Sequence, residues 1–312
     1  MEKRRCSLIT NDLNKASILL YDGLVCGVEI MTIAISIKVN DGVVLATDSA
    51  STMYRKDEQG NSGIINVYDN ANKVANLHKN IPVGIITWGA GSIGKSSIST
   101  LFKDFRKRIM GKDPENLDMR INVDDYNIKE IANSFKDFIY DDLYLKAFSN
   151  VEKQQLGFII AGYSTKQDMA EEWRMDIGPD GCNGPYLIRT LNVCGISWGG
   201  MPEAIIRLYL GFSTQLPNTL KECDIDDGKI EEIITKIKAK HLAPMVFDPM
   251  PIQDAIDLGM FLVDLTKNYY KFVPGAPSVG GPTEVAVITK HEGYKWVTRK
   301  LYFDGKYNPG GE

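Results

Sequence analysis

Residues 32–48 read Thr-Ile-Ala-Ile-Ser-Ile-Lys-Val-Asn-Asp-Gly-Val-Val-Leu-Ala-Thr-Asp. Two apolar runs, 33–39 and 43–46, flank Asn40-Asp41-Gly42, and an Asp-Gly pair between hydrophobic runs is a strong short-range signal for a β-hairpin. Asp48 follows the second run directly. The stretch therefore predicts two strands, with Thr32 before the first and Asp48 at the end of the second.

Thr32 stands directly behind Met31. Removal of that methionine leaves a threonine whose hydroxyl and free α-amino group share one residue, which is a nucleophile carrying its own base. Inside a longer chain the same threonine has no free amine. The position of the N-terminus, at Met1, at Met31 or at a processed Thr32, therefore decides whether this chemistry exists.

Residues 1–31 sustain no helix or strand period, and their apolar patches are broken by Asp22 and Gly23. A secretory signal has a longer apolar run and a small-residue cleavage site. We interpret residues 1–31 as a propeptide or as an upstream extension translated from a wrong start codon, and we favour the second interpretation.

The composition is that of an ordinary globular protein, with 44% hydrophobic and 24% charged residues in 312. A net charge of −4 gives no electrostatic reason to expect a nucleic-acid or anionic-membrane partner. The five cysteines and three histidines show no metal-ligand or disulfide spacing, and no apolar run reaches the ~20 residues of a membrane span. We expect a cytoplasmic protein with reduced thiols and no metal or organic cofactor.

Hydrophobic periodicity predicts further strands and helices along the chain. The order is strands, two helices, strands, two or three helices, strands, which indicates two mixed or antiparallel sheets packed together with helices on both outer faces. The predicted strands are 73–77, 81–87, 156–163, 172–176, 186–193, 284–289 and 294–302, and the predicted helices are 91–110, 128–148, 202–210, 230–239 and 252–270. Residues 52–72 are expected to be a loop or a long hairpin excursion, 213–227 a connector and 304–312 a polar tail.

Gly89-Ala-Gly-Ser-Ile-Gly-Lys-Ser96 matches the P-loop pattern, in which backbone N–H groups cradle phosphate and the lysine reaches it. Two observations weaken this hypothesis. No later apolar strand offers a good partner aspartate for magnesium, and short hairpins surround the motif where P-loop proteins have βαβ units. The glycines and Ser92 also suit a tight turn that caps a helix.

The chain resembles the proteasome β-subunit family of N-terminal-nucleophile threonine hydrolases. Residues 32–48 are similar, without a gap, to the family's opening, and 48–52 continue like its Asp-Ser-Arg-Ala-Thr. The similarity resumes at Lys73-Val74 and at 83–91, and is looser at 156–163, 195–200 and 279–289. The resemblance implies a bacterial proteasome-like peptidase with a four-layer αββα sandwich, spanning residues 32–303.

The resemblance also implies site roles. Thr32 is the nucleophile, Lys73 the cation beside its hydroxyl and Asp48 the carboxylate that holds the lysine. The N–H of Gly89 is the candidate oxyanion donor, and Ser197 is the candidate supporting serine. The family's aspartate and serine before the final Gly-Gly pair lack clear counterparts here: Ser278 is out of register with Gly280, and the aspartate is missing. The 48–73 connector is longer than in the family, which leaves Lys56 as a substitute for Lys73.

The predicted function is therefore hydrolysis of amide or peptide bonds through Thr32 after loss of residues 1–31. The expected partners are a peptide or protein substrate, further copies of the chain in a ring, and an ATP-dependent unfoldase. The alternatives are a catalytically silent scaffold subunit like proteasome α-subunits, a small-molecule amidase, and a P-loop nucleotide-binding protein. Neither the substrate nor the ring size is predicted.

Overall fold

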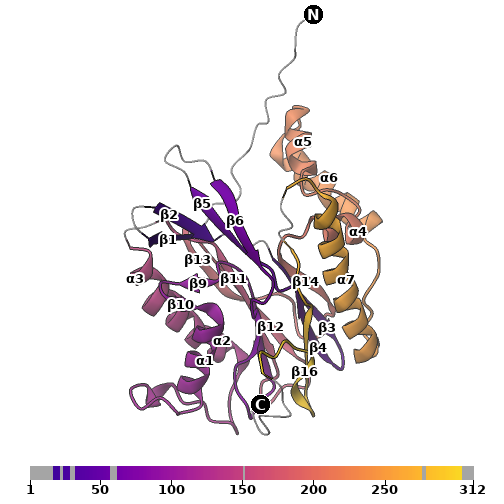
Figure 1. The fold of residues 1–312 in the computed structure, drawn as a ribbon. Coiled ribbons are helices and arrows are strands. Elements are labelled where there is room, and N and C mark those ends of the chain that lie inside the picture. The colour runs from indigo at the N-terminus through magenta and orange to yellow at the C-terminus, as the bar shows by residue number, and fades with distance from the viewer. Residues whose placement is uncertain are drawn as a thin grey trace, which may run out of the picture.

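The computed structural model describes residues 17–21, 24–28, 32–56, 62–149, 152–275 and 279–303. The predicted tail 304–312, Ser278 and most of residues 1–31 lie outside this range. The chain is α+β, and its sheets are antiparallel, which confirms the predicted class (Figure 1).

Two five-stranded sheets form the centre of the molecule, with strand orders β13-β12-β11-β8-β7 and β14-β3-β4-β15-β16. The strands of the first are β7 (Val74–Asn76), β8 (Val83–Gly89), β11 (Leu156–Gly162), β12 (Glu171–Gly178) and β13 (Gly181–Leu187). The strands of the second are β3 (Ile33–Val39), β4 (Gly42–Thr47), β14 (Gly195–Gly200), β15 (Glu284–Thr289) and β16 (Gly293–Thr298).

The hairpin predicted from residues 32–48 is confirmed as β3 and β4, paired from Ala34–Thr47 to Val39–Gly42. Both strands are buried on both faces. Alternate side chains of a strand point to opposite faces, so Ile33, Ile35 and Ile37 pack toward one core while Ala34 packs into another. The predicted hairpins of β7 with β8 and of β15 with β16 also form.

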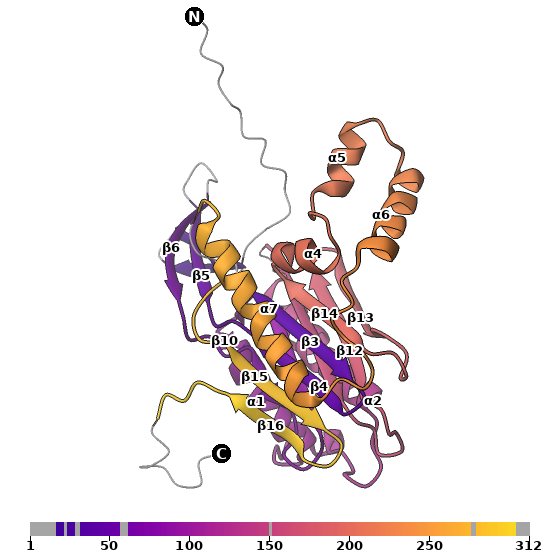
Figure 2. The same ribbon diagram turned by 90° about the vertical axis from the view of Figure 1, so that its right-hand side faces the viewer.

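Helices cover the outer faces of both sheets, and the inner faces pack against each other (Figures 1 and 2). The first sheet is covered by α1 (Ile98–Ile109) and α2 (Ile128–Lys136), which continues through the π-helical segment η2 (Asp137–Tyr144) into α3 (Leu145–Ala147). The second sheet is covered by α7 (Ile252–Phe272) and α4 (Glu203–Tyr209). A short 3₁₀ turn, η1, spans Leu117–Met119.

Several predicted elements differ from the structure. The first helix begins at Ile98, capped by Ser97, because residues 92–97 form the small hairpin β9 (Ser92–Ile93) and β10 (Ser96–Ser97). The predicted strand 186–193 is wrong: the chain pairs earlier, as β13, and again later, as β14. The missed strand β13 contains Pro185 and two glycines, which weaken the strand signal but are tolerated at a sheet edge.

The connector 213–227 contains a helix, α5 (Leu216–Glu222), and the helix predicted at 230–239 is the longer α6 (Asp227–His241). These two helices project from the body of the molecule in Figure 2. Ile230 is the one buried residue among their described side chains, so the apolar periodicity that predicts helices is weak there.

A third sheet has the order β1-β2-β5-β6, formed by β1 (Ser17–Tyr21), β2 (Leu24–Val28), β5 (Ser51–Lys56) and β6 (Ser62–Tyr68). The predicted excursion at 52–72 is therefore mainly a hairpin of β5 and β6. Strand pairing also occurs in 17–28, where no periodicity was visible, and Cys26–Arg55 and Gly27–Tyr54 join β2 to β5. The signal for the first of these pairings was missed: two apolar runs, 17–21 and 24–28, flank Asp22-Gly23, the same pattern that predicts the hairpin of β3 and β4.

Trp88 packs between the two central sheets against glycines of both. A Cβ atom at Gly157 would lie 2.0 Å from the Trp88 ring, and one at Gly199 would lie 2.2 Å from it. Arg174 lies over the same ring, with its guanidinium carbon 4.7 Å from the centroid. Glycine at these two positions therefore leaves room for the indole. The ring, packed between Gly157 and Gly199, sets the spacing of the sheets there.

Phe135 lies at the centre of an aromatic cluster under α1 and α2, with ring centroids 5.1 Å from both Phe105 and Phe158. We expect Phe135→Ala to lower the free energy of unfolding by about 3–5 kcal/mol, because it leaves a cavity in a fully buried core. Urea denaturation measures this. Tyr302→Ala is the matched control, since Tyr302 is 97% exposed and should change stability little. Equal effects of the two variants would contradict the described core.

Candidate active site

Three strand ends bring Thr32, Asp48 and Lys73 together. Thr32 precedes β3, Asp48 follows β4, and Lys73 precedes β7 in the other central sheet. Because β3 and β4 are antiparallel, the start of one and the end of the other meet, and the Asp48 N–H donates to the Ile33 carbonyl at 3.4 Å. The Thr87 N–H of β8 donates to the Lys73 carbonyl at 3.0 Å, which fixes the third strand end.

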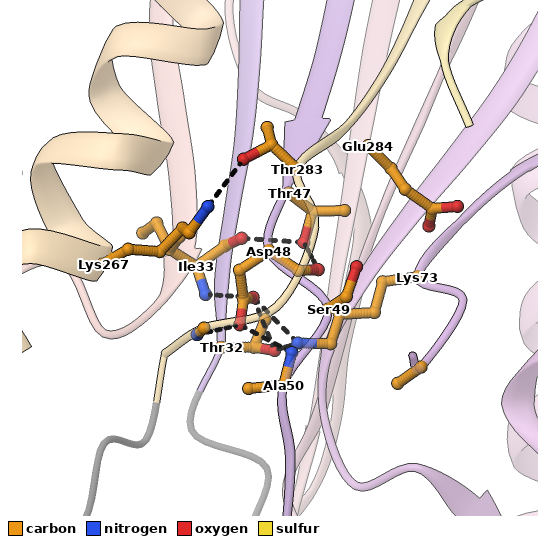
Figure 3. Close-up of polar contacts among 12 residues, drawn as sticks. Thr32, Ile33, Thr47, Asp48, Ser49, Ala50, Lys73, Lys267, Thr283 and Glu284 are labelled. Atoms are coloured by element: carbon orange, nitrogen blue, oxygen red, sulfur yellow. Dashed lines mark hydrogen bonds and ion pairs between the residues drawn. The ribbon is translucent and has the colours of Figure 1, made fainter. Parts of the chain in front are cut away.

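The Asp48 carboxylate is the centre of this group (Figure 3). Its Oδ1 accepts hydrogen bonds from Thr32 Oγ1 at 3.1 Å, from the Ile33 N–H at 3.1 Å and from Lys73 Nζ at 2.8 Å. Its Oδ2 accepts from two further backbone N–H groups, those of Ala50 at 3.0 Å and Gly280 at 3.1 Å. Asp48 and Thr32 are fully buried. Five donors hold this buried carboxylate in one orientation.

Lys73 is buried and contacts both other residues. Its Nζ donates to Thr32 Oγ1 and forms the ion pair with Asp48. Burial lowers the pKa of Lys73 below that of a free lysine, and the negative charge of Asp48 opposes this shift. The ammonium is thus placed against a hydroxyl oxygen, where it can stabilise negative charge on that oxygen.

Gly89 ends β8 and lines the same cavity as Lys73, together with Ala90 and Gly91. Its φ of +88° favours glycine, and a Cβ atom there would lie 2.3 Å from the Gln155 carbonyl oxygen. The cavity has a volume of about 510 Å³. Gly89 therefore lies at the wall of an open space beside the predicted site, although no described contact joins it to Thr32.

Ser197 is not brought into contact with Thr32 in the described structure. The β14–β3 register pairs Ser197 with Ser36, three pairs along from Ile33–Gly200, which is roughly 10 Å of strand. Its hydroxyl accepts a hydrogen bond from Arg189, whose other nitrogen lies 3.2 Å from Glu172. Ser197 therefore belongs to a separate buried charge cluster between the sheets.

A second ion pair beside the site was not predicted. Lys300 Nζ lies 2.8 Å from Glu284 and also donates to Ser49 Oγ. The available signal was Glu284, a carboxylate heading an otherwise apolar strand. The donation from Gly280 to Asp48 is a backbone contact, which no side-chain pattern predicts. Lys56, the alternative to Lys73, lies at the end of β5.

The P-loop match does not form a phosphate loop between a strand and a helix. Residues 92–97 are the hairpin of β9 and β10, Lys95 is exposed, and the helix starts only at Ile98. β8 is antiparallel to both its neighbours. The backbone N–H groups of a helix start are therefore not placed around Lys95.

No group of three or more histidine, cysteine, aspartate or glutamate residues is arranged to hold a metal ion within the described ranges. Among the helices described, none combines the length and apolar character needed to cross a membrane.

Comparison with known proteins gives structural neighbours only. No protein-family model matches the chain, and no curated protein matches its sequence. A Gly-1 mutant of Anbu from Hyphomicrobium sp. strain MC1 is similar in structure, with a TM-score of 0.47, 13% identity, and coverage of 89% of this chain and 90% of that chain. The Anbu complex from Pseudomonas aeruginosa, described as a helical assembly, has a TM-score of 0.45, 13% identity and the same coverage of 89% and 90%. A second Hyphomicrobium Anbu structure has a TM-score of 0.45 and 14% identity, again covering 89% and 90%.

These findings correct the family assignment. We predicted a member of the proteasome β-subunit family, but no family model matches, and the similar structures reported above are of Anbu proteins. The resemblance rested on short segments around strand ends, which related folds can share. At these identities and TM-scores the likeness assigns neither an activity nor a partner to this chain.

We expect Asp48→Ala to lower the free energy of unfolding by about 3–5 kcal/mol, because it leaves the Lys73 ammonium buried without its partner and several N–H groups unpaired. Denaturant unfolding monitored by tryptophan fluorescence measures this. Asp125→Ala is the control, since Asp125 pairs with Lys166 at the surface and should contribute little. Unchanged stability of Asp48→Ala would contradict the described pairing.

Proposed function

We propose that the protein is a threonine-type hydrolase of amide or peptide bonds that acts through Thr32 as an N-terminal nucleophile. The observation that carries the proposal is the contact of both Lys73 Nζ and the Asp48 carboxylate with the Thr32 hydroxyl oxygen. A threonine hydroxyl is a weak nucleophile at neutral pH and needs an adjacent base and a nearby positive charge.

The proposed reaction requires a free α-amine on Thr32, and hence loss of residues 1–31. The Thr32 oxygen attacks the substrate carbonyl while its proton passes to the α-amine, directly or through water. The tetrahedral intermediate then expels the leaving amine, which takes up that proton, and an ester of Thr32 forms. Water activated by the same α-amine cleaves the ester and restores the hydroxyl.

Within this proposal, Lys73 lowers the cost of negative charge on the threonine oxygen and disfavours protonation of the α-amine. Asp48 keeps the lysine charged and in place. The N–H of Gly89 is the candidate donor to the oxyanion, and the cavity of about 510 Å³ beside it is the candidate substrate pocket. Ser197 is left out of the proposed chemistry because of its place beside Arg189.

The proposal includes the fold and its boundaries. We interpret the helix, sheet, sheet and helix layers as the αββα arrangement of N-terminal-nucleophile hydrolases, formed by residues 32–303. The supporting observations are the open hairpin end that places Thr32 and Asp48 together and the second sheet that supplies Lys73. The N–H of Gly280 donates to Asp48, which ties the segment before β15 to the same group.

We also propose that the protein is a cytoplasmic homo-oligomer acting on a peptide or protein. The support for self-association is the exposure of large apolar side chains on and near the outer helix α7, namely Phe247, Phe261 and Phe272, which are 51–80% exposed. A ring and an unfoldase partner are parts of this proposal. Sedimentation velocity of the purified protein distinguishes an oligomer from a monomer.

We expect Thr32→Ala to abolish hydrolysis and labelling by an epoxyketone, a reagent that needs both the hydroxyl and the amine of the same threonine. Thr32→Ser should retain measurable activity, since it keeps both groups. A panel of fluorogenic peptides and acyl-amides supplies the assay, and activity on acyl-amides alone would favour the small-molecule amidase. Full activity of Thr32→Ala would reject the proposal.

The intact mass of the protein purified from its own host provides a second test. We expect a chain that begins at Thr32, because only that chain has the free amine. A chain that keeps residues 1–31 under native conditions and lacks activity would instead favour the silent scaffold. ATP binding that is lost in Lys95→Ala and retained in Thr32→Ala would favour the nucleotide-binding alternative.

A further inference from the structure

Lys300 lies beside the candidate site, two residues beyond the end of β16. Its Nζ is 2.8 Å from Glu284 Oε2, and its backbone N–H donates to Glu284 Oε1 at 3.3 Å. The Glu284 side chain is 1% exposed and that of Lys300 13%. This ion pair is thus largely shielded from water, where a charge pair is strong but must have all its partners in place.

The same ammonium reaches two other parts of the chain. It donates to Ser49 Oγ and, at 2.9 Å, to the carbonyl oxygen of Ala71. Ser49 immediately follows Asp48, Ala71 lies two residues before Lys73, and Glu284 lies four residues after Gly280. One side chain therefore contacts each of the three segments that carry the groups around Thr32.

Those segments are also tied to one another at this point. The Ser49 N–H donates to the Gly280 carbonyl at 2.9 Å, and Ser49 Oγ donates to the Pro282 carbonyl at 2.5 Å. The Ala71 N–H donates to the Ser49 carbonyl at 3.0 Å. Ser49 Oγ therefore accepts from Lys300 while donating to Pro282, so its hydrogen-bonding capacity is used in one fixed orientation.

We propose that Lys300 is a positioning residue of the site, whose ammonium binds Glu284, Ser49 and the Ala71 carbonyl and thereby fixes Asp48, Lys73 and Gly280 around Thr32. This inference rests on the proposed function of Thr32. Lys300 itself touches neither Thr32 nor any substrate; it acts through the segments that it joins.

The position of Lys300 also has an electrostatic effect on Lys73. The charged groups facing Lys73 are Asp48 and Glu284, which raise its pKa, and Lys300, which lowers it together with burial. The charged groups facing Lys300 are Glu284 and Asp48, together with Lys73 itself. Removal of the Lys300 charge therefore raises the pKa of Lys73, and removal of the Glu284 charge lowers it. Replacing the Lys300 ammonium by a neutral side chain also raises the pKa of a free Thr32 α-amine.

The test compares Lys300→Met, which keeps the aliphatic stem, with Lys300→Arg, which keeps the charge. Lys290→Met is the matched control, because Lys290 lies on the same closing hairpin and pairs with the exposed Asp168. We expect kcat of Lys300→Met to fall about 10²-fold, the effect of a small misplacement of reacting groups, with KM changed less than about twofold. Lys300→Arg should recover part of the loss, and Lys290→Met should match the unchanged protein.

The pH profile separates positioning from a general loss of stability. The acid limb of kcat/KM should move to higher pH in Lys300→Met and to lower pH in Glu284→Gln, because these variants change the local charge in opposite directions. If Lys300 only stabilises the fold, Lys300→Met lowers the thermal stability and leaves both the acid and the alkaline limb of the kcat/KM profile at their original pH. A kcat and pH profile of Lys300→Met equal to those of Lys290→Met would overturn the proposal. If Lys300→Met does not fold, Glu284→Gln decides, and an unmoved acid limb in that variant overturns the proposal.

A measurement of amide hydrogen exchange tests the positioning role of Lys300 independently of the proposed hydrolase function. If the unchanged protein hydrolyses nothing and Thr32 does not react, the proposed function fails, and the Lys300 contacts can still be tested. Faster exchange of the Ser49 and Ala71 amides in Lys300→Met than in Lys290→Met supports the holding role. Equal exchange in the two variants overturns it.

Discussion

The arrangement of the site depends on the ion pair and the hydrogen bonds of the Asp48 carboxylate. A buried carboxylate is stable only when its charge and lone pairs are matched, and a missing partner costs several kcal/mol. Its partners come from the start of β3, from Lys73 before β7 and from Gly280 before β15. Satisfying one side chain therefore forces segments from both central sheets to end at the same place.

The hairpin of residues 32–48 could be predicted because its signals are local: two apolar runs, an Asp-Gly turn and a terminal aspartate. Lys73 was found through resemblance, and the structure places it against Thr32 and Asp48. Lys300 carried no signal, because its partner Ser49 is 251 positions away and a lysine near a strand end is usually exposed to solvent. Contacts of that kind depend on topology, which no single segment encodes.

Ser197 is a predicted site residue that the structure does not bring into contact with Thr32. In β3 the isoleucines at 33, 35 and 37 face α7, so Ser36 and Lys38 face the other sheet. Glu172 on β12 accepts from Ser36 at 2.6 Å and pairs with Arg189, and this network includes Ser197. The interface between the sheets thus holds a second buried charge cluster, with its own requirement for complete pairing.

The hydrogen bond from the Gly280 N–H to Asp48 joins residues 232 positions apart. Glu284 and Lys300, which lie beside the same group, follow Gly280 in the last tenth of the chain. During synthesis the ribosome releases Thr32 and Asp48 long before these residues, so the growing chain carries both side chains without the contacts that orient them. The order of the polypeptide therefore delays assembly of the site until the closing hairpin has left the ribosome.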